Sequence, residues 1–98
     1  MADTLPEVRH NKAHSRYEME VDGMLSVADY RMDGNKMLFT HTGVPRELEG
    51  RGIAGKIVKF ALDDARAQNF TVVPLCSYVV TYIRRHAEYQ DLLAKDEI

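Results

Sequence analysis

Three glycines, at positions 50, 52 and 55, separate two parts of the chain that differ in hydrophobic periodicity. Before them apolar residues alternate with polar ones, and after them apolar residues recur every three or four positions. This change predicts that the strands end and a helix begins at the glycines. Glycines let a backbone approach a phosphate closely, and the N–H groups of the following helix point at it. Residues 50–56 are therefore a candidate phosphate-binding loop.

The residues before the loop predict a three-stranded antiparallel meander over positions 15–42. Its first run alternates as a half-buried strand does, with an apolar face of Tyr17, Met19 and Val21 and a polar face of Glu18 and Glu20. Asp22-Gly23 forms a turn into residues 25–32, and Asp33-Gly34-Asn35 forms a second turn into residues 36–42. Residues 8–14 predict either a weak strand or an irregular lead-in.

The residues after the loop predict a helix, a strand and a second helix. An apolar stripe at helical spacing runs from Ile53 to Ala65, with Asn69 as the expected C-cap. Residues 70–75 are apolar and β-branched, and this strand is expected to pair parallel to the strand before the loop because a helix connects the two. Residues 77–86 predict a helix with Ser77 as its N-cap, and residues 88–95 a short helical tail.

The chain length and composition limit the classes of protein that fit. A length of 98 residues predicts one domain over residues 1–98. The formal charge is −2 with both signs interspersed, which predicts no nucleic-acid partner and no anionic membrane surface. No apolar run is long enough to span a bilayer, and the N-terminus lacks the apolar region of a signal peptide. Because Cys76 is the only cysteine, no internal disulfide forms, and a cytoplasmic location is the expectation.

Three common kinds of site do not fit the sequence. An ATP-binding P-loop needs Ser or Thr after its lysine, and Ile57 stands there. A dinucleotide-binding loop follows its strand directly, whereas here five residues intervene after Val44. Such a loop also needs an acidic residue at the end of the next strand to bind the ribose, and here that strand ends VVPLC. His10 and His14 have i, i+4 spacing but no second ligand pair, so no metal site is predicted.

A third reading of the loop concerns coenzyme A. Residues 49–54, EGRGIA, resemble the [Q/R]-x-x-G-x-[G/A] loop of the GCN5-related N-acetyltransferases, and the order of elements is also the same. The blocks HTGVP, GRGIA, VPLCSYV and HAEYQDLL make residues 8–94 similar to the very small acetyl-CoA-binding members of that family. The resemblance implies a mixed α/β (α+β) fold. Two departures are Glu49, where Gln or Arg is usual, and Ala87, where proline is usual.

The resemblance implies a coenzyme site with acetyl-CoA as co-substrate and no metal. The pyrophosphate would lie at the helix N-terminus, with Glu49 pointing away or capping the turn. Pro74 would mark where two parallel strands part, so that the pantetheine arm meets free backbone groups from Thr42 to Val44. The implied coenzyme-binding residues are Thr42, Gly43, Val44, Gly50, Arg51, Gly52, Ile53, Ala54, Gly55, Lys56, Ser77 and Tyr78.

Three side chains are candidates for catalysis, each with a structural alternative. Cys76 follows a strand and precedes a helix N-terminus, which favours thiolate, and the resemblance implies that it is the reactive position; a lone cysteine is otherwise a small buried hydrophobe. His41 is the candidate general base if it faces Cys76, and is otherwise an exposed strand-end residue. Tyr82 is a candidate general acid or a core residue.

The function implied is acetyl-CoA binding with transfer of the acetyl group to an amine acceptor. The acceptor is a small molecule or a protein side chain, and the chain is too short for the helices that shape the acceptor site in larger relatives. That site is therefore expected to be open or completed by a protein partner. Two alternatives are a non-catalytic acetyl-CoA-sensing module and an adaptor that recruits another chain through an open sheet edge.

Overall fold

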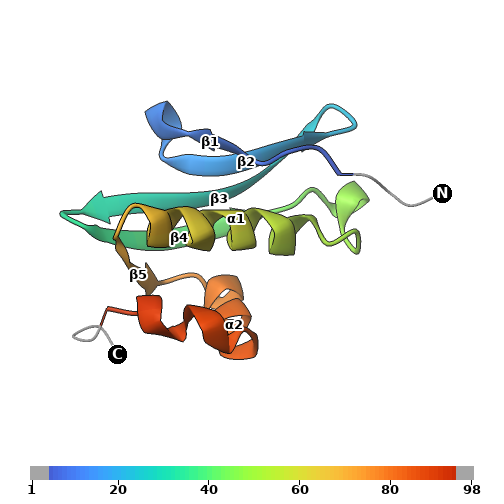
Figure 1. Ribbon diagram of the computed structural model, residues 1–98. Coiled ribbons are helices and arrows are strands. Elements are labelled where there is room, and N and C mark those ends of the chain that lie inside the picture. Colours follow the sequence, from blue (N-terminus) through green and yellow to red (C-terminus); the bar gives the residue numbers. More distant parts are fainter. Residues whose placement is uncertain (1–4, 95–98) are drawn as a thin grey trace.

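The computed structural model describes residues 5–94, which form one five-stranded sheet with helices packed against it. The strand order is β1-β2-β3-β4-β5, so each strand lies beside its neighbours in sequence. Helix α1 runs along β3 and β4, while α2 lies beside β5 at one edge of the sheet (Figure 1). The elements are β1 Arg9–Asn11, β2 Arg16–Val21, β3 Met24–Asp33, β4 Lys36–Gly43, β5 Thr71–Pro74, α1 Ile53–Ala67, α2 Ser77–Arg85 and the short 3-10 helices η1 Lys12–His14, η2 Arg46–Leu48 and η3 Ala87–Leu92.

The predicted antiparallel meander is confirmed and is one strand longer than expected. Residues 9–11, in the segment where the sequence predicted a weak strand or a lead-in, pair antiparallel with β2. The turn between β2 and β3 has positive φ at both Asp22 and Gly23, as a two-residue type I′ hairpin requires. The mixed α/β fold expected from the sequence is therefore present, with a four-stranded antiparallel part and one parallel strand.

β4 and β5 pair in parallel, as expected, but only over part of β4. Their register runs from Lys36 opposite Thr71 to Phe39 opposite Pro74. Beyond this point the N–H groups of Leu75 and Cys76 both donate to the carbonyl oxygen of Phe39, at 3.0 Å each. The chain then turns into α2, while β4 continues to Gly43. The two parallel strands thus part at Pro74.

Helix α1 places its apolar stripe against the sheet. Its end differs from the prediction by one residue: Gln68 is the C-cap, and Asn69 follows it in the left-handed conformation with φ 63°. Asn69 N–H donates to Arg66 O and Phe70 N–H to Ala65 O, which is the Schellman arrangement. The fully buried side chains shared by helix and sheet include Tyr17, Met19, Met37, Phe39, Ile53, Ile57, Val58 and Leu62.

The expected cap of α2 is wrong. Cys76 precedes the helix in extended conformation as its N-cap, Ser77 is the first helical residue, and no side chain caps this end. The helical tail expected at residues 88–95 is a 3-10 helix that ends at Leu92, after which Leu93 forms an isolated parallel bridge with Val72. Lys95 lies outside the described residues. Among residues 5–94, no helix has both the length and the apolar character needed to cross a bilayer.

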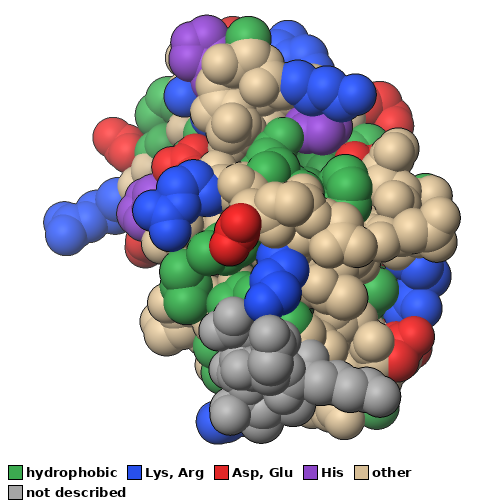
Figure 2. Space-filling view, turned by 90° about the vertical axis from the view of Figure 1, so that its left-hand side faces the viewer, with side chains coloured by type: hydrophobic (Ala, Val, Ile, Leu, Met, Phe, Trp, Pro, Cys, Tyr) green, Lys and Arg blue, Asp and Glu red, His purple; other side chains and the backbone are tan. Residues whose placement is uncertain are grey.

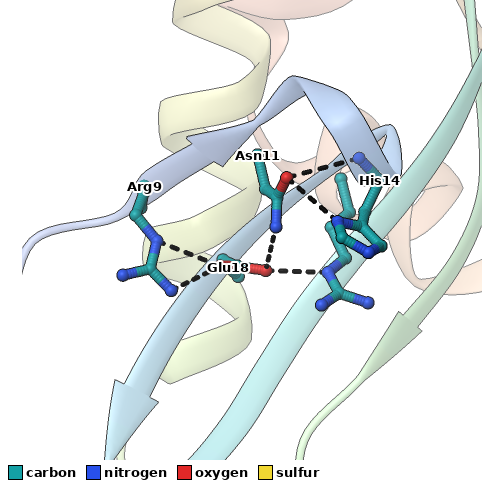
Figure 3. A network of polar contacts seen from close by, with 5 residues as sticks. Arg9, Asn11, His14 and Glu18 are labelled. Atoms are coloured by element: carbon teal, nitrogen blue, oxygen red, sulfur yellow. Dashed lines mark hydrogen bonds and ion pairs between the residues drawn. The ribbon is translucent and has the colours of Figure 1, made fainter.

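Glu18 also departs from the expected pattern, because a side chain predicted on the polar face is buried. Its side chain is 3% exposed. The carboxylate accepts hydrogen bonds from Arg9 and from Asn11 of β1 and from Arg16 of β2 (Figure 3). Burial raises the pKa of the carboxyl group, but the hydrogen bonds from Arg16, Arg9 and Asn11 outweigh it and lower the pKa to about 2. Hydrogen bonds from Arg9, Asn11 and Arg16 therefore replace water around the buried carboxylate of Glu18.

Candidate functional site

The glycine loop has the backbone conformation that its composition suggests. Gly50 and Gly52 have φ of 85° and 79°, where side chains are strained, and nothing lies within 4 Å of a Cβ added at either position. Gly52 is the N-cap of α1, and the first hydrogen bond of the helix runs from Lys56 N–H to its carbonyl oxygen at 3.1 Å. The N–H groups of Ile53, Ala54 and Gly55 precede that bond, so the helix itself provides no acceptor for them.

A pocket of about 360 Å³ lies at this helix start. It joins three segments that are far apart in sequence: the end of β4, the loop into α1, and the first turn of α2. Its lining residues are Thr42, Val44, Leu48, Glu49, Gly50, Gly52, Ile53, Ala54 and Tyr78. Seven of these belong to the predicted coenzyme-binding set, while Leu48 and Glu49 do not. The buried side chain of Leu48, in η2, is part of the core beneath the loop, and no local sequence signal indicates this.

The two cations of the loop make contacts elsewhere on the molecule. Arg51 lies 3.3 Å from the carboxylate of Asp22, in the β2–β3 turn. The Lys56 ammonium donates to the carbonyl oxygens of Leu5 at 3.3 Å and Pro6 at 2.9 Å. Neither residue lines the pocket. Both side chains are long enough to reach partners outside the loop, and a position in the loop sequence does not identify those partners.

The other three predicted residues also lie outside the pocket lining. A Cβ added at Gly55 would stand 3.6 Å from the Tyr78 hydroxyl and 3.9 Å from the Tyr82 ring, both ordinary contact distances, so Gly55 lies where α1 faces α2. A Cβ added at Gly43 would meet the ring of His41 at 3.0 Å. Ser77 is exposed at the start of α2.

The outer edge of β4 is open beside the pocket. β3 pairs with β4 as far as Gly43, while β5 pairs with it only as far as Phe39. Backbone groups on the β5 side of residues 40–43 therefore have no strand partner within the described chain. The edge is open as the position of Pro74 predicted, except that the backbone of Thr42 contacts the Cys76 thiol.

Cys76 lies where β4 and α2 meet. Its Sγ is 3.5 Å from the Thr42 hydroxyl. Burial raises the pKa of the thiol, but the hydrogen bonds of the Thr42 side chain and of the Val79, Tyr78 and Thr42 backbones outweigh it, so the pKa is lower than usual. The N–H groups of Tyr78 and Val79 belong to the first turn of α2, so the helix N-terminus acts on the thiol as the sequence suggested.

His41 is not brought into contact with Cys76. Thr40 is an extra residue in β4, because Tyr30 pairs with Phe39 and the next residue back, Asp29, pairs with His41. After this bulge Thr42 pairs with buried Ala28, whereas His41 pairs with Asp29 on the opposite face of the sheet. A base role for His41 stays a prediction without a described contact to the thiol.

Tyr82 lies between α1 and η3. Its ring stacks on His86 at 3.9 Å between centroids and lies 6.1 Å from the ring of Tyr89. The side chain is half-buried, and burial raises the pKa of its hydroxyl, which therefore keeps its proton at neutral pH. These contacts agree with the packing role, and a protonated phenol also has the form that a general acid needs.

Metal ligands do not gather in the described part of the chain. No group of three or more His, Cys, Asp or Glu side chains in residues 5–94 is arranged to hold a metal ion.

Comparisons with known proteins agree with this geometry. A family model described as GCN5-related N-acetyl-transferase matches residues 16–92. The solution NMR structure of a GCN5-like protein from Staphylococcus aureus superposes with a TM-score of 0.72 at 27% sequence identity, covering 90% of this chain and 87% of that chain. The matched region contains the meander, the glycine loop, α1, β5 and α2. With a family model covering most of its length, the chain belongs to the GCN5-related N-acetyltransferase family.

Proposed function

We propose that this protein binds acetyl-CoA in the pocket at the start of α1 and transfers the acetyl group to an amine. The observation that carries the proposal is the pocket itself, in which two left-handed glycines, the helix start and the open edge of β4 converge. The pyrophosphate would accept hydrogen bonds from the N–H groups of Ile53, Ala54 and Gly55, where the helix dipole favours negative charge.

The pantetheine arm would follow the open edge of β4. Its amides would hydrogen-bond with backbone groups of residues 42–44 on the side where β5 has turned away. This course leads from the glycine loop toward Thr42, whose hydroxyl lies 3.5 Å from the Cys76 Sγ. The reactive end of the coenzyme would therefore lie near the thiol, with Tyr78 lining the same pocket.

The chemistry that fits this arrangement is acetyl transfer through Cys76. The thiolate attacks the thioester carbonyl carbon, the bond to the coenzyme sulfur breaks, and coenzyme A leaves as a thiolate that takes a proton. The Tyr82 phenol, which is protonated at neutral pH, is the proton donor in this proposal. A neutral amine then attacks the cysteine thioester, the carbon–sulfur bond to Cys76 breaks and regenerates the thiolate, and the proton that the amine loses restores the Tyr82 phenol.

The acceptor side of the site is proposed to be open. The described residues contain only two α-helices of more than one turn, and both lie beside the coenzyme pocket. An amine acceptor, whether a small molecule or a protein side chain, would reach Cys76 without crossing a lid. A protein partner that completes the acceptor site agrees equally well with this arrangement.

Binding is tested by titrating isotope-labelled protein with acetyl-CoA and following the amide NMR spectrum. We expect the largest shifts at residues 42–44, 50–56 and 76–78. The absence of shifts at about 1 mM ligand, where even weak specific sites begin to fill, would refute coenzyme binding and leave the adaptor function.

Turnover is tested separately with the variant Cys76→Ala. We expect the variant to bind acetyl-CoA as the wild type does and to lose acetyl transfer, and intact-mass analysis of the wild type with acetyl-CoA alone should show one added acetyl group. Thr81→Ala, at an exposed position of the same helix outside the predicted coenzyme-binding set, is the matched control. Full transfer by Cys76→Ala would exclude the covalent route, and binding by the wild type without release of coenzyme A to any amine would support the sensing module.

A further inference from the structure

A second pocket lies at the opposite end of α1 and takes no part in the proposed acetyl transfer. It has a volume of about 420 Å³ and is lined by β1, η1, β3, β4 and the last turns of α1. Asp64, which lines it, follows Ile53 of the coenzyme pocket by eleven residues of continuous helix, about 16 Å along the axis. Figure 2 looks onto this end of the molecule, where hydrophobic side chains are surrounded by charged ones of both signs.

One wall of this second pocket is a fixed cluster of polar and aromatic side chains. His10 stacks on Tyr17 at 4.1 Å between centroids, and its Nε2 lies 2.7 Å from the Tyr30 hydroxyl. The Nδ1 atom lies 3.4 Å from Oδ2 of Asp64, which also accepts a hydrogen bond of 2.7 Å from the Tyr17 hydroxyl. Burial lowers the pKa of His10, opposed by the charge of Asp64, so the ring is neutral at pH 7. These contacts hold Asp64 in place before any ligand arrives.

The wall offers an ammonium group a site of negative potential. Both described contacts of Asp64 involve Oδ2, so Oδ1 accepts no hydrogen bond from the described residues. The side chain is 24% exposed and lines the pocket. The pocket also lies at the C-terminal end of α1, where the helix dipole favours positive charge. The carboxylate oxygen of Asp64 and the C-terminus of α1 thus both favour binding of a positive charge in this pocket.

The opposite charge and an apolar surface complete the pocket. Lys12, in η1, contributes an exposed ammonium group, which suits a carboxylate. The hydroxyl of Ser15 and the amide of Gln68 are further polar groups of the lining. Met32, Met37 and Phe70 provide the apolar part. Thioether and aromatic groups accommodate aliphatic side chains of varied shape.

We propose that this second pocket binds a zwitterionic α-amino acid with an aliphatic side chain. The ammonium group pairs with Asp64, the carboxylate pairs with Lys12, and the side chain packs on Met32, Met37 and Phe70. A ligand that carries both an ammonium group and a carboxylate matches the two charged residues, Asp64 and Lys12, of this lining. Because the site is remote from Cys76, the amino acid is a ligand of the fold and not an acetyl acceptor held for transfer.

The test compares leucine with two molecules that each lack one charge. Labelled full-length protein is titrated with leucine, 3-methylbutylamine and 4-methylpentanoic acid, and amide shifts are followed. We expect shifts from leucine at Lys12, Ser15, Gln68 and Phe70 but not at residues 50–54, and affinity at least about tenfold weaker for either single-charge molecule, as the loss of one charge-assisted contact requires. No shifts from leucine at about 10 mM, or equal binding of 3-methylbutylamine, would overturn the proposal.

Variants separate the two charged contacts. Lys12→Met should weaken leucine binding about tenfold and leave 3-methylbutylamine unchanged, because only the carboxylate contact is lost. Lys59→Met removes an equal charge from α1 at a residue paired with Asp63, outside this pocket, and is the matched control. Lys12 is exposed, so loss of folding is not expected to mask the result. If both variants weaken leucine equally, the effect is general electrostatics and the assigned contact is wrong. Acetyl-CoA shifts, measured in parallel, report on the first pocket independently.

Discussion

The thiol of Cys76 is surrounded by donors from two elements. The Thr42 hydroxyl and backbone come from β4, and the N–H groups of Tyr78 and Val79 come from α2. Their combined effect lowers the pKa of the thiol although burial raises it. Because a thiolate is the nucleophilic form, the reactivity of this residue depends on contacts rather than on exposure alone.

The contribution of Thr42 can be measured with Thr42→Val, which keeps the side-chain shape and removes the hydroxyl. We expect the pKa of Cys76 to rise and its rate of alkylation by iodoacetamide at pH 7 to fall about tenfold, the value of one hydrogen bond to a charged group. The measurement is the pH dependence of the alkylation rate. Thr40→Val removes a hydroxyl that donates to Asp29 O instead and should change nothing. Equal rates for Thr42→Val and the wild type would exclude this contact as a cause.

Glu49 places a carboxylate among the residues that line the proposed coenzyme pocket. Negative charge within a Debye length of the phosphates opposes their binding. Glu49→Gln should therefore tighten acetyl-CoA binding by about two- to fivefold at low salt, and by less at high salt. Isothermal titration at two ionic strengths measures both. Glu47→Gln, an exposed residue outside the lining, is the control. Weaker binding by Glu49→Gln would instead show that the carboxylate caps the loop.

At the scale of elements, Gly55 lies where α1 faces α2. Tyr78 and Tyr82 lie over this glycine, and a Cβ at that position would make ordinary van der Waals contact with both. The φ of Gly55 is not in the left-handed region, unlike that of Gly50 and Gly52. The three glycines of the loop thus differ, because the turn requires Gly50 and Gly52 whereas the space at Gly55 would accept a methyl group.

Gly55→Ala is expected to stabilise the protein by about 0.5–1 kcal/mol, because alanine favours the helix over the unfolded chain. Urea denaturation followed by circular dichroism measures the change. Gly52→Ala should destabilise, since its φ of 79° strains any side chain. Destabilisation by Gly55→Ala would mean that the two tyrosine rings have no room to move. Acetyl-CoA titration of Gly55→Ala then shows whether a methyl group at this position meets the coenzyme.

At the scale of the whole molecule, the N-terminal strand is held by polar contacts on both sides. Arg9 and Asn11 contact the buried carboxylate of Glu18, while His10 contacts Tyr30 and Asp64. These contacts connect β1 with β2, β3 and α1. Because a strand of three residues buries little apolar surface, we infer that its attachment depends on the ionisation of these groups.

This attachment predicts a loss of stability in acid that depends on Glu18. The pKa of the carboxyl is about 2 in the folded protein against an ordinary value of 4.5. A lowered pKa stabilises the fold above the unfolded value, and that contribution disappears as pH falls from about 4.5 toward 2. Glu18→Gln should reduce the free energy of unfolding at pH 7 by about 1–3 kcal/mol and flatten its pH dependence in this window.

Urea denaturation at several pH values between 7 and 2 measures this effect. Glu20→Gln is the matched control, because Glu20 is the exposed acidic residue of the same strand. If the two variants show the same pH dependence, the buried network contributes nothing specific to acid stability. If Glu18→Gln is fully stable at pH 7, the carboxylate is replaceable by any polar group of its shape.

The order and type of the main strands and helices followed from the sequence alone, as did the position of the glycine loop at the start of α1. The sequence patterns that predict these elements involve residues only a few positions apart, so a short stretch of sequence is enough to identify them. They are the alternation of apolar and polar residues, the two Asp-Gly turns and the apolar stripe at helical spacing. The same holds for Gly50 and Gly52, whose left-handed conformation only glycine adopts readily. The resemblance to a known family added the coenzyme and the candidate role of Cys76.

Contacts between distant residues were decided only by the tertiary structure. A single extra residue at Thr40 turns Thr42 toward Cys76 and His41 away, and strict alternation cannot reveal such a bulge. Burial of Glu18 required β1 as a neighbour, and the second pocket required η1 to lie beside the end of α1. Local patterns specify elements, because their forces act along the chain. Strand register and the packing of helices on the sheet determine which side chains meet. These contacts join segments that are far apart in the sequence, so local patterns do not reveal them.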